Sequence, residues 1–480
     1  MLTLADTLSV LMLWDKLLPM IFIGAVGCCV GSLLNVLVWR MPQNLGVVSP
    51  PSRCPKCNTR LTWRENIPVL GWVLLRGRCR FCKSPISAEY PIVEAFVGLL
   101  FVAVYWLFYI APPHTMVFGL DLGLIGPFWA RNGAAATWPT LVVVLGLFAA
   151  LIAMTLIDAR TFTIPIELCW FTAILGVVGH LAQVFWWQAY SQRLAGSMQN
   201  FKTAPVSGGT SMDGYWLWTL PTPSDAAASW WWIGATIGAT VGLGVAWLLV
   251  RTGVLRRSFD DFDTWEKETL AADQAAAAVG VVQTQSEQAE PTDMWLRYPH
   301  GRREMVREMA YLAPAALLGW CGGWIFDKLW GGADAAGGVT QSEPGVLAVG
   351  FAQHVPPLWL AVLCGVLLGY LVGGLTVWAI RIIGTAVKGQ EAMGMGDVHL
   401  LAGVGACLGW IAPVVVFWVL APVIALTIWA GQTVFRRKAA HAMPYGPSLA
   451  AASVLYVLGR PLIEMGITAV LRAPQPIHLP

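Results

Sequence analysis

The chain has 480 residues, of which 57% are hydrophobic and only 12% are charged. Soluble domains carry about 25% charged residues, so the composition excludes a soluble globular protein and indicates a multi-pass membrane protein. The net charge of +3 says little by itself, and we expect the partners to be the lipid bilayer and other proteins, with no nucleic acid.

About 20 apolar residues are needed to cross a hydrocarbon core of roughly 30 Å, so the sequence predicts an all-α polytopic fold with about 8–10 transmembrane helices. The predicted spans are 17–39, 91–112, 138–157, 165–187, 229–250, 309–327, 357–380, 398–413, 415–434 and 446–464. The apolar run after Leu400 is too long for one span, and we expect it to break between Gly409 and Pro413.

The loop after the first span is strongly basic, with Lys and Arg at positions 40, 53, 56, 60, 64, 76, 78, 80 and 83. Lys and Arg accumulate on the cytoplasmic side of membrane proteins, so this loop should be cytoplasmic. Counting the predicted spans from there places Asp158 at the cytoplasmic end of the third span and Asp397 at the cytoplasmic start of the eighth.

These assignments divide the chain into six expected parts. They are a first transmembrane segment (1–40), a small cytoplasmic zinc-binding loop domain (41–90), transmembrane helices carrying Asp158 (91–187), an external loop (188–228), additional transmembrane helices (229–356) with a cytoplasmic linker (255–308), and transmembrane helices carrying Asp397 (357–480). Glycines recur at helical spacing in 234–250 and 365–380, which favours close helix packing over an internal duplication.

Four of the ten cysteines form two CxxC pairs in the basic loop, with 21 residues between the pairs: Cys54, Cys57, Cys79 and Cys82. A CxxC pair lets two thiolates reach one tetrahedral ion at about 2.3 Å, and a second pair completes the site. Four sulfur ligands leave no open position, so we predict a structural zinc or a similar thiophilic metal. The alternatives are unligated thiols or two disulfides, of which disulfides are unfavourable in the cytoplasm.

Two aspartates stand at the ends of apolar runs. Asp158 follows the run 141–157, and Asp397 follows Gly394 and Gly396 immediately before the run that starts at Leu400. A carboxylate at a membrane helix is costly and therefore indicates function. Two carboxylates that meet hold one proton between them and can activate water, as in aspartic proteases. We therefore predict a catalytic pair.

Each aspartate also has a structural interpretation. Asp158 could face water at a helix end beside Arg160, and Asp397 could cap the following helix. The whole chain could instead be a non-enzymatic membrane assembly factor with the cysteine loop as a docking module. A transporter with a proton relay is a further alternative, although it would place the carboxylates in mid-membrane.

The motifs along the chain agree with one known family. They are GSLLNV at 31–36 with Arg40, both cysteine pairs, ENIP at 65–68, RGRC at 76–79, PIS at 85–87, Tyr90, Pro91, Glu94, Ile157 and Asp158 followed by Ile164 and Pro165, GMGD at 394–397 with Leu400, and PYGP at 444–447. On these residues the chain resembles the type IV prepilin peptidases, which are GxGD membrane aspartic proteases. The resemblance covers 20–187 and 357–460.

The resemblance implies an endopeptidase of the bacterial plasma (inner) membrane that removes the leader of prepilins or pseudopilins on the cytoplasmic side. It implies Asp158 and Asp397 as the catalytic pair, with Gly394 and Gly396 supporting the motif. Many members of the family also N-methylate the new N-terminus with S-adenosylmethionine, and a methyltransferase without protease activity is an alternative. No binding residues for that cofactor are identified. His399 stands where the family usually has lysine.

Overall fold

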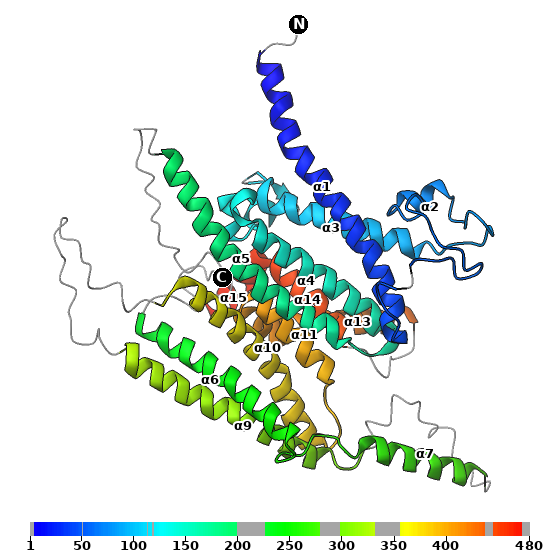
Figure 1. Ribbon diagram of the computed structural model, residues 1–480, viewed down its shortest axis with the longest axis vertical. Helices are drawn as coiled ribbons and strands as arrows, with labels where there is room; N and C mark the ends of the chain where they lie inside the picture. The colour runs from blue at the N-terminus through cyan, green and yellow to red at the C-terminus, as the bar shows by residue number, and fades with distance from the viewer. Residues whose placement is uncertain are drawn as a thin grey trace, which may run out of the picture.

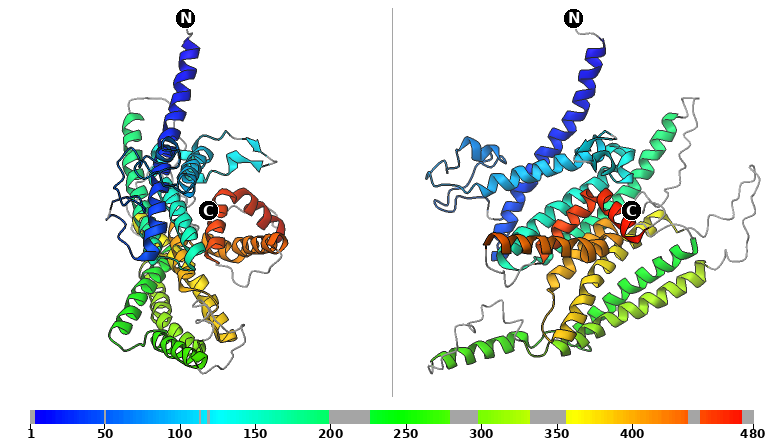
Figure 2. Two further views of the ribbon diagram at one scale, coloured as in Figure 1. Left: turned by 90° about the vertical axis from the view of Figure 1, so that its right-hand side faces the viewer. Right: turned by 180° about the vertical axis from the view of Figure 1, so that it is seen from behind.

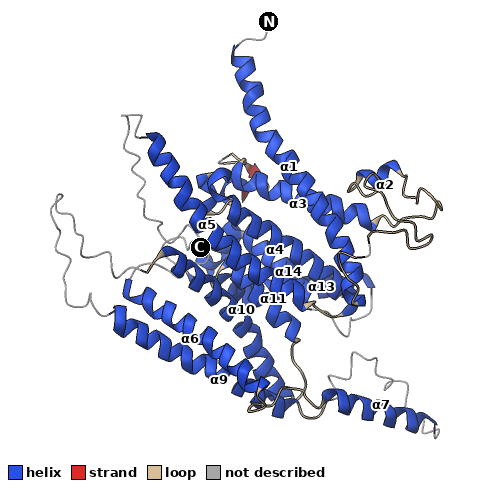
Figure 3. Cartoon of the chain, in the orientation of Figure 1, coloured by secondary structure: helices blue, strands red, loops and turns tan. Residues whose placement is uncertain are grey.

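The computed structural model is almost entirely helical (Figure 3), and it describes residues 4–49, 51–112, 114–117, 120–198, 226–278, 298–331, 356–436 and 445–472. Eight helical stretches within these ranges are long and apolar enough to cross a membrane, or up to nine if one bent helix pair counts as a span. The predicted polytopic helical fold is therefore confirmed.

The spans involve eight long helices and two short segments. The long helices are α1 (Leu4–Arg40), α3 (Glu89–Tyr109), α4 (Ala134–Thr161), α5 (Ile166–Met198), α6 (Ala226–Arg251), α9 (Gly301–Phe326), α10 (Leu358–Lys388) and α13 (Ala421–Arg436). The segments α12 (Ile411–Val415) and η6 (Val416–Leu420) run directly into α13 and form one span with it.

Shorter elements connect or extend these spans. They are η1 (Met41–Gln43), α2 (Leu70–Leu74), β1 (Met116–Val117), β2 (Leu120–Asp121), η2 (Leu122–Leu124), η3 (Phe128–Asn132), α7 (Phe262–Ala278), η5 (Asp327–Gly331), α11 (Met395–Leu408), α14 (Gly446–Leu458) and α15 (Arg460–Leu471). The two strands form a small antiparallel hairpin in which Met116 pairs with Asp121.

The core of the bundle lies around α4 and α11, which pack beside α5, α10 and α14 (Figure 1). In α4, 72% of the most apolar 18-residue stretch is buried by other parts of the protein. In α11 every residue from Leu400 to Leu408 is buried. Helices with such uniformly apolar surfaces are stable when other helices surround them. Asp158 and Asp397 belong to these two central helices.

Two predicted spans differ from the structure. The span 398–413 is wrong as a full crossing, because α11 ends at Leu408 and Gly409 follows with φ of 83°. The break itself falls inside the predicted interval. The span 446–464 is interrupted at Gly459, where α14 and α15 meet at 91°. Pro461 follows this bend in the first turn of α15, where proline is tolerated although it cannot continue the preceding helix.

Two predicted loops contain more helix than expected. The loop 188–228 begins later than predicted, because α5 continues to Met198, and residues 199–225 lie outside the described part. Just before this extension, the indole of Trp186 donates to the carbonyl of Ala135 in α4 at 2.8 Å. The linker 255–308 includes α7 and the first turns of α9, with residues 279–297 outside the described part.

The helices α6 and α9 form a tightly packed pair at one side of the molecule, and α7 projects away from its base (Figures 1 and 2). A Cβ atom at Gly238 would lie only 1.9 Å from the carbonyl oxygen of Leu318, so glycine is required for this approach. Likewise, a Cβ at Gly369 of α10 would lie 2.0 Å from the carbonyl oxygen of Gly405 in α11. Close packing at both glycine-spaced runs is therefore confirmed.

Candidate functional site

Asp158 lies in the last turn of α4 and is buried, with 6% of its surface exposed. The helix ends three residues later at Thr161, because Phe162 adopts a left-handed conformation with φ of 54° and donates its N–H to the carbonyl of Asp158. Arg160 points elsewhere and pairs with Glu89 at 3.1 Å. The interpretation of Asp158 as a water-facing residue paired with Arg160 is therefore wrong.

Asp397 lies in the first turn of α11 and is partly buried. The N-cap of this helix is Gly394, so the alternative that Asp397 caps the helix is also wrong. A carboxylate in the first turn faces the unpaired N–H groups of the helix start, which favour negative charge. Gly396 lets a neighbour approach, since a Cβ there would lie 3.0 Å from the Cβ of Ile164.

The structure brings Asp158 and Asp397 into one neighbourhood. The two side chains are close enough for the charge of Asp158 to act on Asp397. Ile164, from the short connection between α4 and α5, packs against Gly396 beside Asp397 and against Gly446 beside Asp158. An apolar side chain between the two helix ends limits the access of water and strengthens the interaction between the carboxyls.

Two residues at the start of α14 complete this neighbourhood. A Cβ at Gly446 would lie 2.5 Å from Oδ2 of Asp158, so only glycine leaves room for that carboxylate. Tyr445 precedes it and lies close enough to Asp397 to interact with its charge. The sequence motif contains both residues, but nothing in their spacing revealed that they adjoin the aspartates.

The four predicted metal-ligating cysteines converge in the loop between α1 and α3. All four Sγ atoms lie within 4.8 Å of one another. The Sγ atoms of Cys54 and Cys82 are 3.8 Å apart, and those of Cys57 and Cys79 are 4.0 Å apart. Zinc–sulfur bonds of about 2.3 Å in a tetrahedron place the sulfurs about 3.8 Å apart. The cluster therefore fits one tetrahedral thiophilic ion.

Each cysteine pair sits on a similar turn, which explains how so short a segment presents four sulfurs. Cys54 donates its N–H to the carbonyl of Thr59, and Cys79 donates to that of Ser84, at 3.0 and 2.8 Å. The residue after each pair, Asn58 or Lys83, has a positive φ that closes the turn. The two cysteine pairs therefore share one main-chain arrangement.

Glu94 of α3 connects the cysteine loop, the segment between α1 and α3, to the membrane helices. It is buried, and its carboxylate accepts a 2.6 Å hydrogen bond from the N–H of Val69. Val69 has φ of 60°, which is unusual for a β-branched residue and needs such an anchor. Within the loop, Glu65 accepts from the N–H of Thr62 and pairs with Arg80, which lowers the pKa of the Glu65 carboxyl.

Comparisons with known proteins support the family resemblance. The family described as "Bacterial Peptidase A24 N-terminal domain" matches residues 25–108, which include the cysteine loop. The prepilin leader peptidase/N-methyltransferase of Myxococcus xanthus is 46% identical over 101 residues, which are 20% of this chain and 30% of that protein. The resemblance to the prepilin leader peptidases is confirmed.

Further relatives have the same printed name. The protein from Klebsiella pneumoniae is 38% identical over 107 residues, 21% of this chain and 46% of the relative. The protein from Pectobacterium carotovorum is 29% identical over 184 residues, 34% of this chain and 56% of the relative. The chain therefore matches less than two thirds of the length of these relatives. No solved structure matches it significantly.

Proposed function

We propose that this protein is an aspartic endopeptidase of the bacterial plasma membrane, which removes the leader peptide of prepilin-like substrates at the cytoplasmic face. The observation that carries the proposal is the position of Asp158 and Asp397 at the ends of α4 and α11 that lie on either side of Ile164. The similarity of the amino-terminal part to prepilin leader peptidases supports the choice of substrate.

The proposed mechanism uses one shared proton. The ionised carboxylate of the pair accepts a proton from a bound water as the water oxygen attacks the scissile carbonyl carbon. The protonated carboxyl donates its proton to the carbonyl oxygen, which gives a neutral tetrahedral diol. When the C–N bond breaks, the carboxyl proton passes to the leaving nitrogen, while the other carboxylate takes a proton from a hydroxyl of the diol as the carbonyl forms again. The pair therefore returns to its singly protonated state.

The position of the pair suits a substrate that is half in the membrane. A prepilin-like chain has a basic leader, which stays on the cytoplasmic side, followed by an apolar helix that lies in the bilayer. Its scissile bond would lie at the boundary between them, next to the ends of α4 and α11. The expected substrates are therefore prepilins or pseudopilins held laterally by the bilayer.

The cysteine loop would hold one zinc through Cys54, Cys57, Cys79 and Cys82. The tetrahedral spacing of the sulfurs supports this choice. Four protein ligands leave no site for substrate, so the ion would keep the loop folded beside α1 and α3. The loop would take no direct part in peptide hydrolysis.

A second activity, N-methylation of the new N-terminus with S-adenosylmethionine, is proposed on the relatives' names alone. A methyltransferase without protease activity and a non-enzymatic assembly factor remain the alternative functions.

The decisive experiment is incubation of the purified protein, in a lipid bilayer, with a prepilin that carries a basic leader, followed by mass measurement of the product. We expect loss of the leader, with or without the added mass of one methyl group. Asp158→Asn and Asp397→Asn should each lower the cleavage rate by about 10²- to 10⁴-fold, because in either variant an amide replaces one carboxyl and the two side chains can no longer share a proton.

Asp15→Asn is the matched control, since Asp15 is an exposed aspartate of another membrane helix. It should cleave like the unchanged protein. Normal cleavage by either catalytic variant would refute the carboxyl pair. Methylation of a pilin whose leader has been removed beforehand, without cleavage of the leader-bearing prepilin, would instead support the methyltransferase alternative.

A further inference from the structure

Arg381 connects three parts of the chain near Asp397. Its side chain is buried, with 3% exposed. Its Nε donates to both carboxylate oxygens of Glu308 in α9, at 3.2 and 3.3 Å. Its Nη1 donates to Glu391 and to the carbonyl of Met393, both in the segment that leads to Asp397. A planar guanidinium can make these bonds at once, whereas lysine has only a point charge.

The segment 389–394 lies folded back on the end of α10. Ala392 donates its N–H to the hydroxyl of Thr385, which is fully buried. Gly389 ends α10 with φ of 77° and turns the chain toward α11. Since Asp397 comes three residues after this segment, the position of the segment determines where α11 starts. Arg381 therefore fixes the backbone immediately before Asp397.

The partner that holds Arg381 belongs to the region between α5 and α10, which the family resemblance does not cover and which we call the insertion. Glu308 is 2% exposed, and it also accepts from the indole of Trp378 at 2.7 Å. The ring of Phe259, in the segment before α7, faces the guanidinium of Arg381 at 5.5 Å. The insertion thus contacts Arg381 through two residues that come from separate segments.

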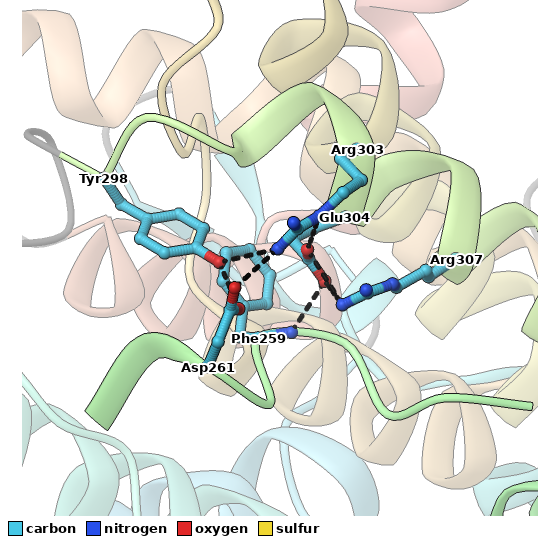
Figure 4. A network of polar contacts seen from close by, with 6 residues as sticks. All are labelled: Phe259, Asp261, Tyr298, Arg303, Glu304 and Arg307. Carbon is cyan, nitrogen blue, oxygen red and sulfur yellow. Dashed lines mark hydrogen bonds and ion pairs between the residues drawn. The ribbon is translucent and has the colours of Figure 1, made fainter. Parts of the chain in front are cut away.

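Further contacts hold the insertion against α10 and the start of α9. Arg302 donates to the carbonyls of Ala386 and Val387 in the last turn of α10, at 3.0 and 3.2 Å. Glu304 is fully buried and accepts from the N–H of Phe259 and from Arg307 (Figure 4). This network fixes the backbone that carries Phe259, and it leaves Glu308 directed toward Arg381.

We propose that Glu308 and Arg381 are positioning residues for Asp397, so that the inserted helices are part of the proteolytic unit. The inference rests on the proposed function of Asp397. Neither residue touches the substrate: Glu308 orients Arg381, and Arg381 holds the segment 389–394 in place. The insertion therefore determines how accurately Asp397 faces Asp158.

The test compares Glu308→Gln with the unchanged protein in two measurements. Glutamine has the same shape and can still accept from Trp378, so the fold should persist while the charge that holds Arg381 is lost. Hydrogen exchange of the peptide covering 389–397 should become faster, and this measurement needs no activity. The value of kcat should fall about tenfold with KM within about twofold, because a small misplacement weakens catalysis more than binding.

Arg381→Lys and the double variant complete the design. Arg381→Lys should lower kcat by about 10- to 100-fold, since an ammonium cannot hold Glu308, Glu391 and Met393 together. Adding Glu308→Gln to it should cost little more, because both changes remove the same contact. The pH–rate profile should change shape, since the spacing of the two carboxyls determines how they share a proton.

Glu464→Gln is the matched control, since it is the same carboxylate-to-amide change at an arginine–carboxylate contact in α15 and leaves Glu308 and Arg381 in place. It should keep both the exchange rate of 389–397 and kcat. Unchanged exchange and kcat in Glu308→Gln would overturn the inference, as would an equal loss in Glu464→Gln. Faster exchange in a protein that never cleaves prepilin would support the contact and refute the proposed function instead.

Discussion

At the scale of a single residue, Gly446 makes room for the carboxylate of Asp158. Its missing side chain leaves the space that Oδ2 of Asp158 occupies, although the two residues belong to different helices. Because a carboxylate at a membrane helix is costly, both aspartates could be predicted from the sequence as candidate catalytic residues. No such cost marks a glycine, so its relation to Asp158 becomes apparent only from the packing of α14 against α4.

Gly446→Ala should therefore lower activity with little loss of stability. The added Cβ would meet the end of the Asp158 side chain, which can rotate away at small cost. We expect kcat for prepilin cleavage to fall about 10- to 100-fold, because the displaced carboxylate no longer faces Asp397. The thermal unfolding midpoint should change by only a few degrees. Kinetics and a thermal melt of the same preparation measure both effects.

Gly466→Ala provides the control for this substitution. Gly466 lies in α15, and nothing surrounds the position that its Cβ would take. Alanine is favoured over glycine inside a helix, so this variant should be at least as stable and fully active. Equal activity of Gly446→Ala and the unchanged protein would show that Asp158 does not need its present orientation.

At the scale of elements, the cysteine loop was predictable because its chemistry is local. The CxxC spacing alone specifies which sulfurs can share an ion, and the two similar turns at Cys54 and Cys79 realise that spacing. The break after α11 was predictable for a similar reason, since Gly409 stands inside an apolar run. The sharp bend at Gly459 was missed because the apolar pattern continues across it.

Cys54→Ser should reduce zinc from one ion per chain to a small fraction of that value. Structural zinc contributes about 10–16 kcal/mol of binding free energy in small zinc domains, so its loss should unfold the loop. Metal analysis and limited proteolysis between residues 51 and 88 measure the two effects. Cys29→Ser changes an exposed cysteine outside the cluster and should keep its zinc. Retained zinc in Cys54→Ser would contradict the four-cysteine site.

The segment before α7 should detach from α9 in acid. Hydrogen bonds from the Tyr298 hydroxyl and from Arg303 lower the pKa of Asp261 to about 2. An unfolded aspartate has a pKa of about 3.9. Since the folded value is the lower one, this stabilisation is complete above about pH 4 and is lost as the pH falls toward 2.

Pepsin cleavage near residues 258–278 measures this detachment, because pepsin is active over that acidic range. Cleavage of the unchanged protein should increase between about pH 4 and pH 2 relative to cleavage elsewhere in the chain. Asp261→Asn should be cut readily already at about pH 4. Identical pH dependence in the two proteins would show that Asp261 does not hold this segment.

At the scale of the whole molecule, the distribution of charge predicts the orientation in the membrane. The loop between α1 and α3 carries most of the basic residues near the first span, so it should lie in the cytoplasm. A membrane-impermeant amine reagent should label Lys56 and Lys83, both exposed, in inside-out vesicles and leave them unlabelled in sealed right-side-out vesicles. Peptide mass analysis measures the labelling. Labelling with the opposite sidedness would invert the proposed topology and place the aspartates outside.

The role of the inserted region could not be predicted from its composition. The segment 255–308 combines an Ala-rich stretch with scattered charges, which is typical of a linker. The buried carboxylates Glu304 and Glu308 in the described part contradict that interpretation for the end of the segment. Their partners lie far away in the chain, and burial of a charge depends on such distant contacts rather than on local pattern.

The short length of α11 affects the depth in the membrane at which the proposed reaction takes place. Its 14 residues extend about 21 Å, less than the roughly 30 Å thickness of a hydrocarbon layer. A lipid-facing helix of this length would force the bilayer to thin, but neighbouring helices enclose α11 completely from Leu400 onward. The level of Asp397 relative to the headgroups is therefore imposed by protein packing, and it should stay constant in membranes of different thickness.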